Sequence, residues 1–171
     1  MGEYLTRHAS AGDLGSLTAT FFVLLALTGL ALISTWLAFK DVREHKLPGT
    51  VVRPAWAASA VLFGSAAVLS GEPSRLLGMA GGAVVLWLLY YLLRRVSRGA
   101  LGRGDVRLAG MLGTVLGFAS PWHVLWATVL GFVVGGLYAV FLLISRRAGA
   151  ADRVPFGPAM LAGTALSLVL V

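Results

Sequence analysis

The 171-residue chain contains no cysteine and few charged residues. The absence of cysteine excludes a disulfide scaffold, a thiol nucleophile and a zinc site with cysteine ligands. Charged residues make up 12% of the chain, about half of the share that is usual in soluble domains. Hydrophobic residues make up 58%, which excludes intrinsic disorder. This composition is typical of an integral membrane protein.

Long apolar segments recur along the chain, and a helix needs about 17–25 mostly apolar residues to cross a bilayer. We predict six spans, at residues 15–39, 54–70, 76–93, 106–119, 121–145 and 155–171. The fourth is short, and Ser120-Pro121 after it indicates a tight hairpin, because proline begins a helix more readily than it continues one. The predicted fold is an all-α integral membrane protein with about six helices in a bundle. Residues 1–14 would be a polar N-terminal tail, and residues 15–171 a single membrane domain.

Basic residues are distributed unevenly among the loops that join these segments. Twelve of the 14 lysines and arginines lie in or beside the first, third and fifth loops. Because cytoplasmic loops are enriched in basic residues, we expect these loops to face the cytoplasm and both termini to lie on the other side. The net charge of +7 could also favour nucleic acid. No segment is left to form a basic binding face, so we expect no nucleic-acid partner.

Small and aromatic residues add detail to the predicted bundle. Glycines four residues apart allow helix backbones to approach closely, and we expect such pairs to lie at helix interfaces. The pairs are Gly78/Gly82, Gly113/Gly117 and Gly131/Gly135. Aromatic residues near the ends of the predicted spans, among them Trp56 and Tyr90, are interpreted as interfacial anchors.

Two of the seven acidic residues stand at the predicted cytoplasmic membrane boundary. Asp41 closes the first span and Asp105 opens the fourth. A carboxylate at this depth is costly unless it is paired or hydrated. Either residue could be a simple helix cap, since the free N–H groups and the dipole at a helix N-terminus favour an anion near Asp105. Position alone is therefore compatible with a structural role.

The residues before Asp105 favour chemistry over capping. The segment reads Gly102-Arg103-Gly104-Asp105. Two glycines remove side-chain bulk, so that another backbone, such as a substrate strand, could approach the carboxylate closely. This GxGD pattern is the signature of a class of intramembrane aspartic proteases.

Three segments together resemble the type IV prepilin peptidase family, in the family's order. Residues 41–48 resemble its first aspartate with the basic stretch and aliphatic-proline pair that follow. Residues 102–108 contain the GxGD pattern, and residues 155–158 resemble the motif that opens a late helix. Arg107 stands where the family usually has lysine. Many members also carry paired CxxC zinc ligands and an N-methyltransferase activity. Because this chain contains no cysteine, we expect a short form with the peptidase activity alone.

The resemblance implies a membrane-embedded aspartic endopeptidase that removes the short basic leader from type IV prepilins or pilin-like precursors, just before the long apolar helix of the pilin. Asp41 and Asp105 would be catalytic and would share one proton, because two close carboxylates do not both ionise cheaply. No metal or other cofactor is needed. The active-site loop would contain Gly102, Gly104 and Arg107. The residues expected to line the cleft or meet the substrate are Pro155, Phe156, Gly157, Pro158 and Glu44.

The resemblance also implies a multi-pass protein of the bacterial cytoplasmic membrane, with its active site facing the cytoplasm. Its partners would be the lipid bilayer and a pilin precursor as protein substrate, and the oligomeric state stays open. Two other hypotheses remain. One is a small transporter with acidic ion sites, which predicts carboxylates near the bilayer midplane and often repeated halves. The other is a non-catalytic pilus or secretion assembly protein, which only activity data would distinguish.

Overall fold

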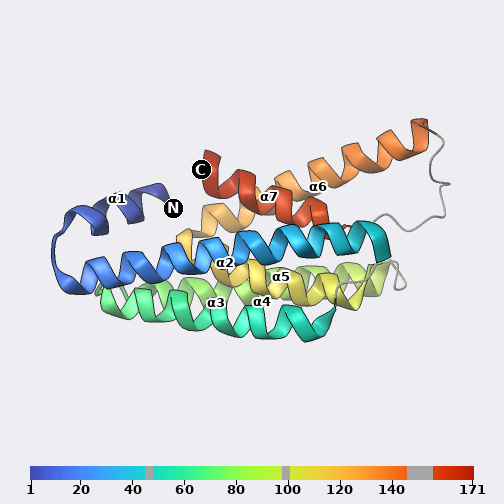
Figure 1. The fold of residues 1–171 in the computed structure, drawn as a ribbon. Helices are drawn as coiled ribbons and strands as arrows, with labels where there is room; N and C mark the ends of the chain where they lie inside the picture. Colours follow the sequence, from blue (N-terminus) through green and yellow to red (C-terminus); the bar gives the residue numbers. More distant parts are fainter. Residues whose placement is uncertain (45–47, 98–100, 146–155) are drawn as a thin grey trace.

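The computed structural model describes residues 1–44, 48–97, 101–145 and 156–171 (Figure 1). In these ranges the regular structure is entirely helical. The helices are α1 (Gly2–Ser10), α2 (Leu14–Glu44), α3 (Gly49–Leu69), α4 (Ser74–Val96), α5 (Arg103–Ala119), α6 (Pro121–Ile144) and α7 (Gly157–Leu170). The predicted all-α fold class is confirmed.

Four of these helices, α2, α3, α4 and α6, are long and apolar enough to cross a membrane. Helix α5 has 17 residues, at the lower limit for a span, and carries Arg103, Asp105 and Arg107 in its first two turns, and α7 has only 14 residues. The predicted count of six spans is therefore not confirmed within the described residues. The predicted hairpin after α5 is present, because Ser120 has an extended backbone and Pro121 begins α6.

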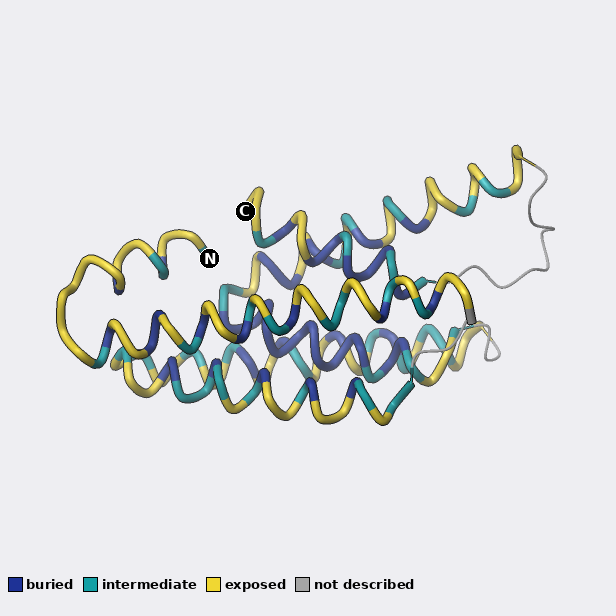
Figure 2. The backbone as a smooth tube through the Cα atoms, in the orientation of Figure 1, coloured by how far each residue is buried: buried dark blue, intermediate teal, exposed yellow. Residues whose placement is uncertain are grey.

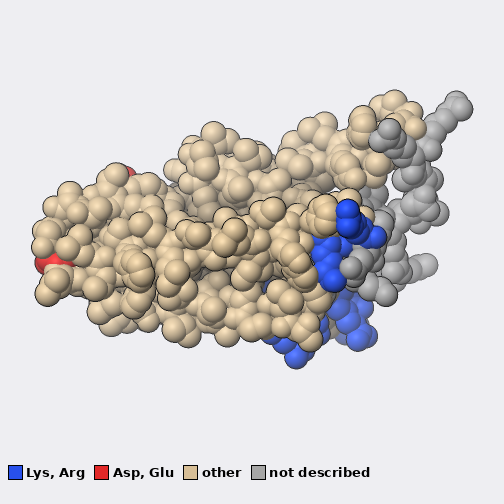
Figure 3. Space-filling model, in the orientation of Figure 1, with Lys and Arg blue, Asp and Glu red and all other residues tan. Residues whose placement is uncertain are grey.

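Successive helices from α2 to α7 alternate in direction (Figure 1). The C-terminal ends of α2, α4 and α6 therefore lie at the same end of the bundle as the N-terminal ends of α3, α5 and α7. Figure 3 shows lysine and arginine side chains gathered at this end and acidic side chains at the other. We call it the basic end, and its described residues are Lys40, Arg43, Arg53, Arg94, Arg95, Arg103 and Arg107. Its basic residues come from the loops and helix ends in which the sequence concentrates them.

Helix α5 lies in the interior of the bundle, where it is buried along almost its whole length (Figure 2). A helix that is apolar all round must be covered on every side. Helices α3, α4, α6 and α7 all contact α5. The short helix that begins at the basic end is thus the element around which the longer helices pack.

Glycines set the distance between α4 and α5. Gly78 faces Gly117, and Gly82 faces Gly113. A Cβ atom added at any of these four positions would overlap the carbonyl oxygen of the facing glycine. Gly131 and Gly135 of the third pair lie at the interface of α6 and α7, close to Ala159. The close packing predicted for the glycine pairs is confirmed.

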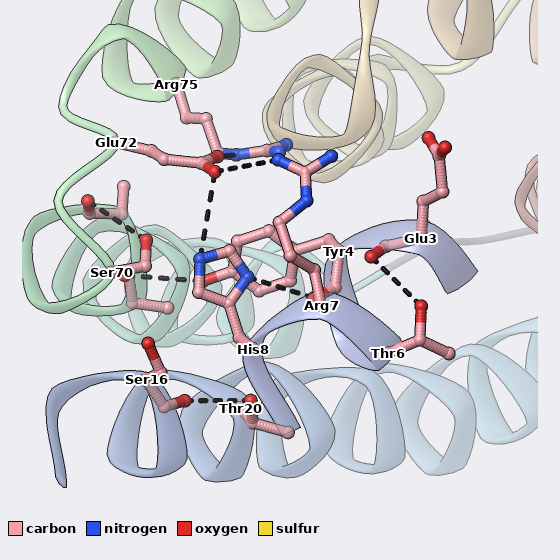
Figure 4. A network of polar contacts seen from close by, with 12 residues as sticks. Glu3, Tyr4, Thr6, Arg7, His8, Ser16, Thr20, Ser70, Glu72 and Arg75 are labelled. Carbon is pink, nitrogen blue, oxygen red and sulfur yellow. Dashed lines mark hydrogen bonds and ion pairs between the residues drawn. The ribbon is translucent and has the colours of Figure 1, made fainter. Parts of the chain in front are cut away.

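The end of the bundle opposite the basic end is closed by α1 and by Arg75 (Figure 4). Arg75 donates through Nη1 to the carbonyl oxygen of Phe118 at 2.7 Å, in the last turn of α5. Last-turn carbonyls have no partner within their own helix, so a cation stabilises them. Glu72 pairs with Arg75, and the Tyr4 ring lies 4.6 Å from the Arg75 guanidinium. Helix α1 arises within the predicted polar tail, where the sequence analysis expects no helix.

The α4–α5 contact predicts that Gly113→Val destabilises the protein by about 1–3 kcal/mol, because the two backbones must move apart. Gly29→Val is the matched control, since an added Cβ there meets nothing within 4 Å. Both variants pay the same helix-propensity cost. Thermal unfolding in detergent should show a lower midpoint for Gly113→Val than for Gly29→Val. Equal midpoints would contradict the packing argument.

Candidate active site

Asp41 lies in the last turn of α2 at the basic end and is only 5% exposed. Its Oδ2 accepts a hydrogen bond from the backbone N–H of Gly157 at 3.1 Å. Gly157 is the first residue of α7, so this bond joins residues 116 apart in sequence. The N-terminus of a helix offers unpaired N–H groups and a partial positive charge. The start of α7 therefore both positions the Asp41 carboxylate and stabilises its charge.

Asp105 lies in the first turn of α5 and is 8% exposed. Its Oδ2 accepts the backbone N–H of Gly102 at 3.0 Å. This is the capping contact that the position of Asp105 predicts. Both carboxylates thus accept an N–H group at the start of a short helix, one from its own helix and one from a distant helix.

Asp105 lies outside the four long apolar helices, and its surroundings disfavour the charged form. Burial is the larger cause and the negative charge of Asp41 the smaller, and with both acting the pKa of Asp105 is raised from an ordinary value of 3.8 to about 6. The hydrogen bond from Gly102 acts in the opposite direction. The two carboxyl groups therefore interact electrostatically. A pair coupled in this way takes up and releases protons jointly.

Glycines and Arg107 shape the chain around Asp105. A Cβ atom at Gly102 would lie 3.1 Å from Asp105 Oδ2, so glycine leaves room for the carboxylate to reach back. Gly102 is exposed and Gly104 is half-buried, which leaves the backbone before Asp105 open to approach. The guanidinium of Arg107 lies against Gly49, where an added Cβ would overlap it. Arg107 therefore packs the start of α5 against the start of α3.

The third predicted segment meets the site through the start of α7. Gly157 and Pro158 are the first two residues of α7, where proline loses no helical hydrogen bond. Phe156 comes directly before them, and Pro155 lies outside the described residues. Glu44 ends α2, and its side chain is likewise outside what the structure describes. The structure thus brings Asp41, Asp105 and the start of α7 to the same end of the bundle.

Three aromatic rings pack together beside the start of α7, a cluster that the sequence analysis does not predict. Tyr90 of α4 stacks with Phe132 of α6 at 6.0 Å between ring centroids, and Phe156 lies 6.0 Å and 5.4 Å from these two rings. We call these three residues the aromatic cluster. Gly135 makes room for it, since a Cβ there would lie 2.6 Å from the Phe156 ring.

The prediction that Tyr90 and Trp56 are interfacial anchors is wrong. Tyr90 is 3% exposed, and the indole N–H of Trp56 donates to Thr114 Oγ1 of α5 at 2.8 Å. The signal for Tyr90 was available in the helix register. Gly82, Leu86 and Tyr90 are spaced by four residues and share a face, so the packed Gly82 predicts a buried Tyr90.

Comparisons with known proteins agree on one family. The model of the type IV leader peptidase family matches residues 28–144, a range that includes Asp41 and Asp105. The prepilin leader peptidase/N-methyltransferase of Dickeya chrysanthemi is 32% identical over 153 residues, which cover 83% of this chain and 52% of that protein. The protein of the same name from Bacillus subtilis is 30% identical over 92 residues, 54% of this chain and 34% of that one. The chain spans about half the length of the curated relatives it matches, or less. No solved structure matches it significantly.

The electrostatic interaction between the carboxyls predicts that Asp41→Asn lowers the pKa of Asp105, because it removes the like charge. Infrared difference spectroscopy can follow the protonated carboxyl band of Asp105 as pH rises through about 6. The band is assigned by its loss in Asp105→Asn. Glu72→Gln, at the opposite end of the bundle, should leave the titration unchanged. An identical titration in Asp41→Asn and the unsubstituted protein would show that the two carboxyls do not interact.

Proposed function

The chain belongs to the type IV leader peptidase family, and we propose that it is an aspartic endopeptidase within the membrane. Its substrates would be type IV prepilins or pilin-like precursors, from which it removes the short basic leader. One observation carries the proposal. Two buried carboxyls from different helices, Asp41 of α2 and Asp105 of α5, interact at one end of the bundle.

The proposed chemistry uses the two carboxyls as a coupled acid and base. The ionised carboxylate takes a proton from a water molecule, whose oxygen attacks the carbonyl carbon of the scissile peptide bond. The protonated carboxyl donates a hydrogen bond to the carbonyl oxygen and stabilises the charge that develops there. The C–N bond then breaks as the amine nitrogen receives a proton from the pair. Because the pair shares its proton, the two roles are assigned to the pair and not to either residue.

Neighbouring residues would position the carboxyls and the substrate. The N–H groups of Gly102 and Gly157 each hold one carboxylate oxygen, which fixes the orientation of both acids. The open backbone at Gly102 and Gly104 would receive the substrate strand, and Phe156 and Pro158 would line the cleft. Arg107 would hold the active-site loop against α3. Pro155 and Glu44 keep the roles that the resemblance implies, in the cleft and near the basic leader.

We place the basic end, and with it the active site, in the bacterial cytoplasm. The positive-inside rule supports this orientation, because the basic loops gather at that end. The same placement speaks against a transporter, whose ion-binding carboxylates are expected near the bilayer midplane. Asp41 and Asp105 lie instead in terminal turns of their helices.

Leader removal requires both carboxyls, so Asp41→Asn and Asp105→Asn should each reduce cleavage at least about 100-fold. The assay co-expresses the chain in membranes with a tagged pilin-like precursor and follows loss of the leader on a gel. Asp13→Asn is the matched control. Asp13 is exposed at the opposite end and caps α2 through the N–H of Ser16 at 2.8 Å. The Asp13→Asn variant should cleave the precursor at the same rate as the unsubstituted chain.

Each outcome of this assay separates two hypotheses. Cleavage that survives either substitution, with the variant present in the membrane, would overturn the assignment of the aspartate pair. Cleavage lost equally in Asp13→Asn would point to folding and not to catalysis. An unsubstituted chain that cleaves no pilin-like precursor would favour a non-catalytic assembly protein.

The raised pKa of Asp105 also predicts the pH dependence of cleavage. The reaction needs one proton on the pair, and a raised pKa means that this proton is held until the pH passes about 6. Activity should therefore fall as pH rises through that value, and it should also fall at acidic pH, where both carboxyls are protonated. The initial rate measured in detergent across the pH range checks this. Full activity well above that pH would contradict the prediction that loss of the proton held by Asp105 limits the reaction.

A further inference from the structure

An apolar groove runs between α4 and α6 and is floored by α5. Its cavity has a volume of about 620 Å³. One stripe of α4 forms its longer wall, and the first half of α6 forms the other. The lining residues are Leu77, Gly78, Gly81, Gly82, Val85, Leu86, Leu89, Gly117, Pro121, Val124, Leu125 and Thr128. Thr128 is the only polar side chain among them, so the groove is suited to an apolar occupant.

The groove ends close to the candidate active site. Its α4 wall ends at Leu89, directly before Tyr90, and its α6 wall ends at Thr128, one turn before Phe132. Tyr90 and Phe132 stack on each other just beyond the end of the groove that faces the basic end. Phe156 packs against both rings, and the next residue, Gly157, donates its N–H to Asp41. The aromatic cluster thus separates the groove from the aspartate site.

The α4 wall allows another helix to come close. Gly78 and Gly82 are already used against α5, whereas a Cβ atom added at Gly81 would meet nothing within 4 Å. A glycine inside a helix costs about 1 kcal/mol relative to alanine, and the described part of the fold gives Gly81 no close contact that would require it. Helices associate in lipid through close van der Waals packing at small residues, because lipid tails are as apolar as leucine. Gly81 provides such a position in the groove.

The length of the groove also suits a helix. The stripe from Leu77 to Leu89 is about 18 Å long at 1.5 Å per helical residue, more than half of the roughly 30 Å hydrocarbon core. A precursor whose leader is removed at the membrane boundary must place its apolar helix beside the enzyme within the bilayer. The groove lies between two helices that are long and apolar enough to cross a membrane, and it ends at the aromatic cluster beside the aspartate site.

We infer that the groove between α4 and α6 holds the apolar helix of the precursor, an inference that rests on the proposed function. The end of that helix next to the cleaved bond lies against Tyr90, Phe132 and Phe156. The aromatic cluster then lies between the end of the precursor helix and the two carboxyls. The peptide bond just beyond that end of the helix reaches Asp41 and Asp105. The groove thereby aligns the precursor with the aspartate pair.

Cysteine crosslinking tests this directly, because the chain has no native cysteine. Val85 lines the groove and is 56% exposed, whereas its neighbour Val84 is 61% exposed and lies outside the groove. Val85→Cys and Val84→Cys are therefore a matched pair. Each is co-expressed in membranes with a pilin-like precursor that carries one cysteine in its apolar helix. After oxidation, Val85→Cys should give a crosslinked product on a gel, and Val84→Cys should stay at background.

Kinetics supply the second measurement. Val85→Trp fills the groove and should raise KM for the precursor about tenfold, with kcat changed much less, because binding and not chemistry is impaired. Val84→Trp, at the neighbouring position outside the groove lining, should leave both constants unchanged. Equal effects of the two tryptophans would mean that the groove does not bind the precursor.

The outcomes separate this inference from the proposed function. If the unsubstituted chain cleaves the precursor while the two cysteines crosslink equally or not at all, the groove holds lipid and the inference is wrong. If Val85→Cys crosslinks selectively but the unsubstituted chain cleaves nothing, the docking surface stands and the peptidase proposal fails. Absence of both cleavage and crosslinking overturns both.

Discussion

Two buried carboxylates, each held by an N–H group at the start of a short helix, are the constraint on which the rest of the structure depends. A carboxylate is costly at the edge of a membrane unless hydrogen bonds or fixed dipoles offset its loss of water. Asp105 meets this condition at the start of α5 through Gly102. Asp41 meets it through Gly157, which α7 brings back across 116 residues. The helix order places both acids at one end, and their mutual repulsion makes a shared proton favourable.

The short central helix α5 connects this site to the rest of the bundle. It is buried on all sides, so both of its ends must be satisfied by protein groups. Asp105 does this at the first turn, and Arg75 does it at the last turn through the carbonyl of Phe118. The glycine contacts with α4 hold α5 in place between these ends. The position of Asp105 thus depends on packing along the full length of α5, far from the reacting groups.

The aromatic cluster gives the start of α7 a second role. Phe156 contacts rings from α4 and α6, and the residue after it contacts Asp41. A change in the distance between α4 and α6 would therefore be passed to the hydrogen bond on Asp41 through one residue. An apolar helix between α4 and α6 would adjust the same distance. Docking of the proposed substrate helix and the orientation of the Asp41 carboxyl would then be coupled by direct contact.

The sequence by itself determined the helical class, the gathering of basic residues at one end, the glycine contacts and the family. The first three follow from composition or from spacing within one helix, where local geometry is fixed, whereas the family rests on the resemblance of three segments in order. It also singled out Asp41, Asp105 and residues 155–158 as candidates, through their place at helix ends. Tertiary structure alone decided that Gly157 donates to Asp41, that Tyr90 is buried with Phe132 and Phe156, and that α1 packs under Arg75. These contacts join residues far apart in sequence, and their geometry depends on how whole helices pack, which no local pattern specifies.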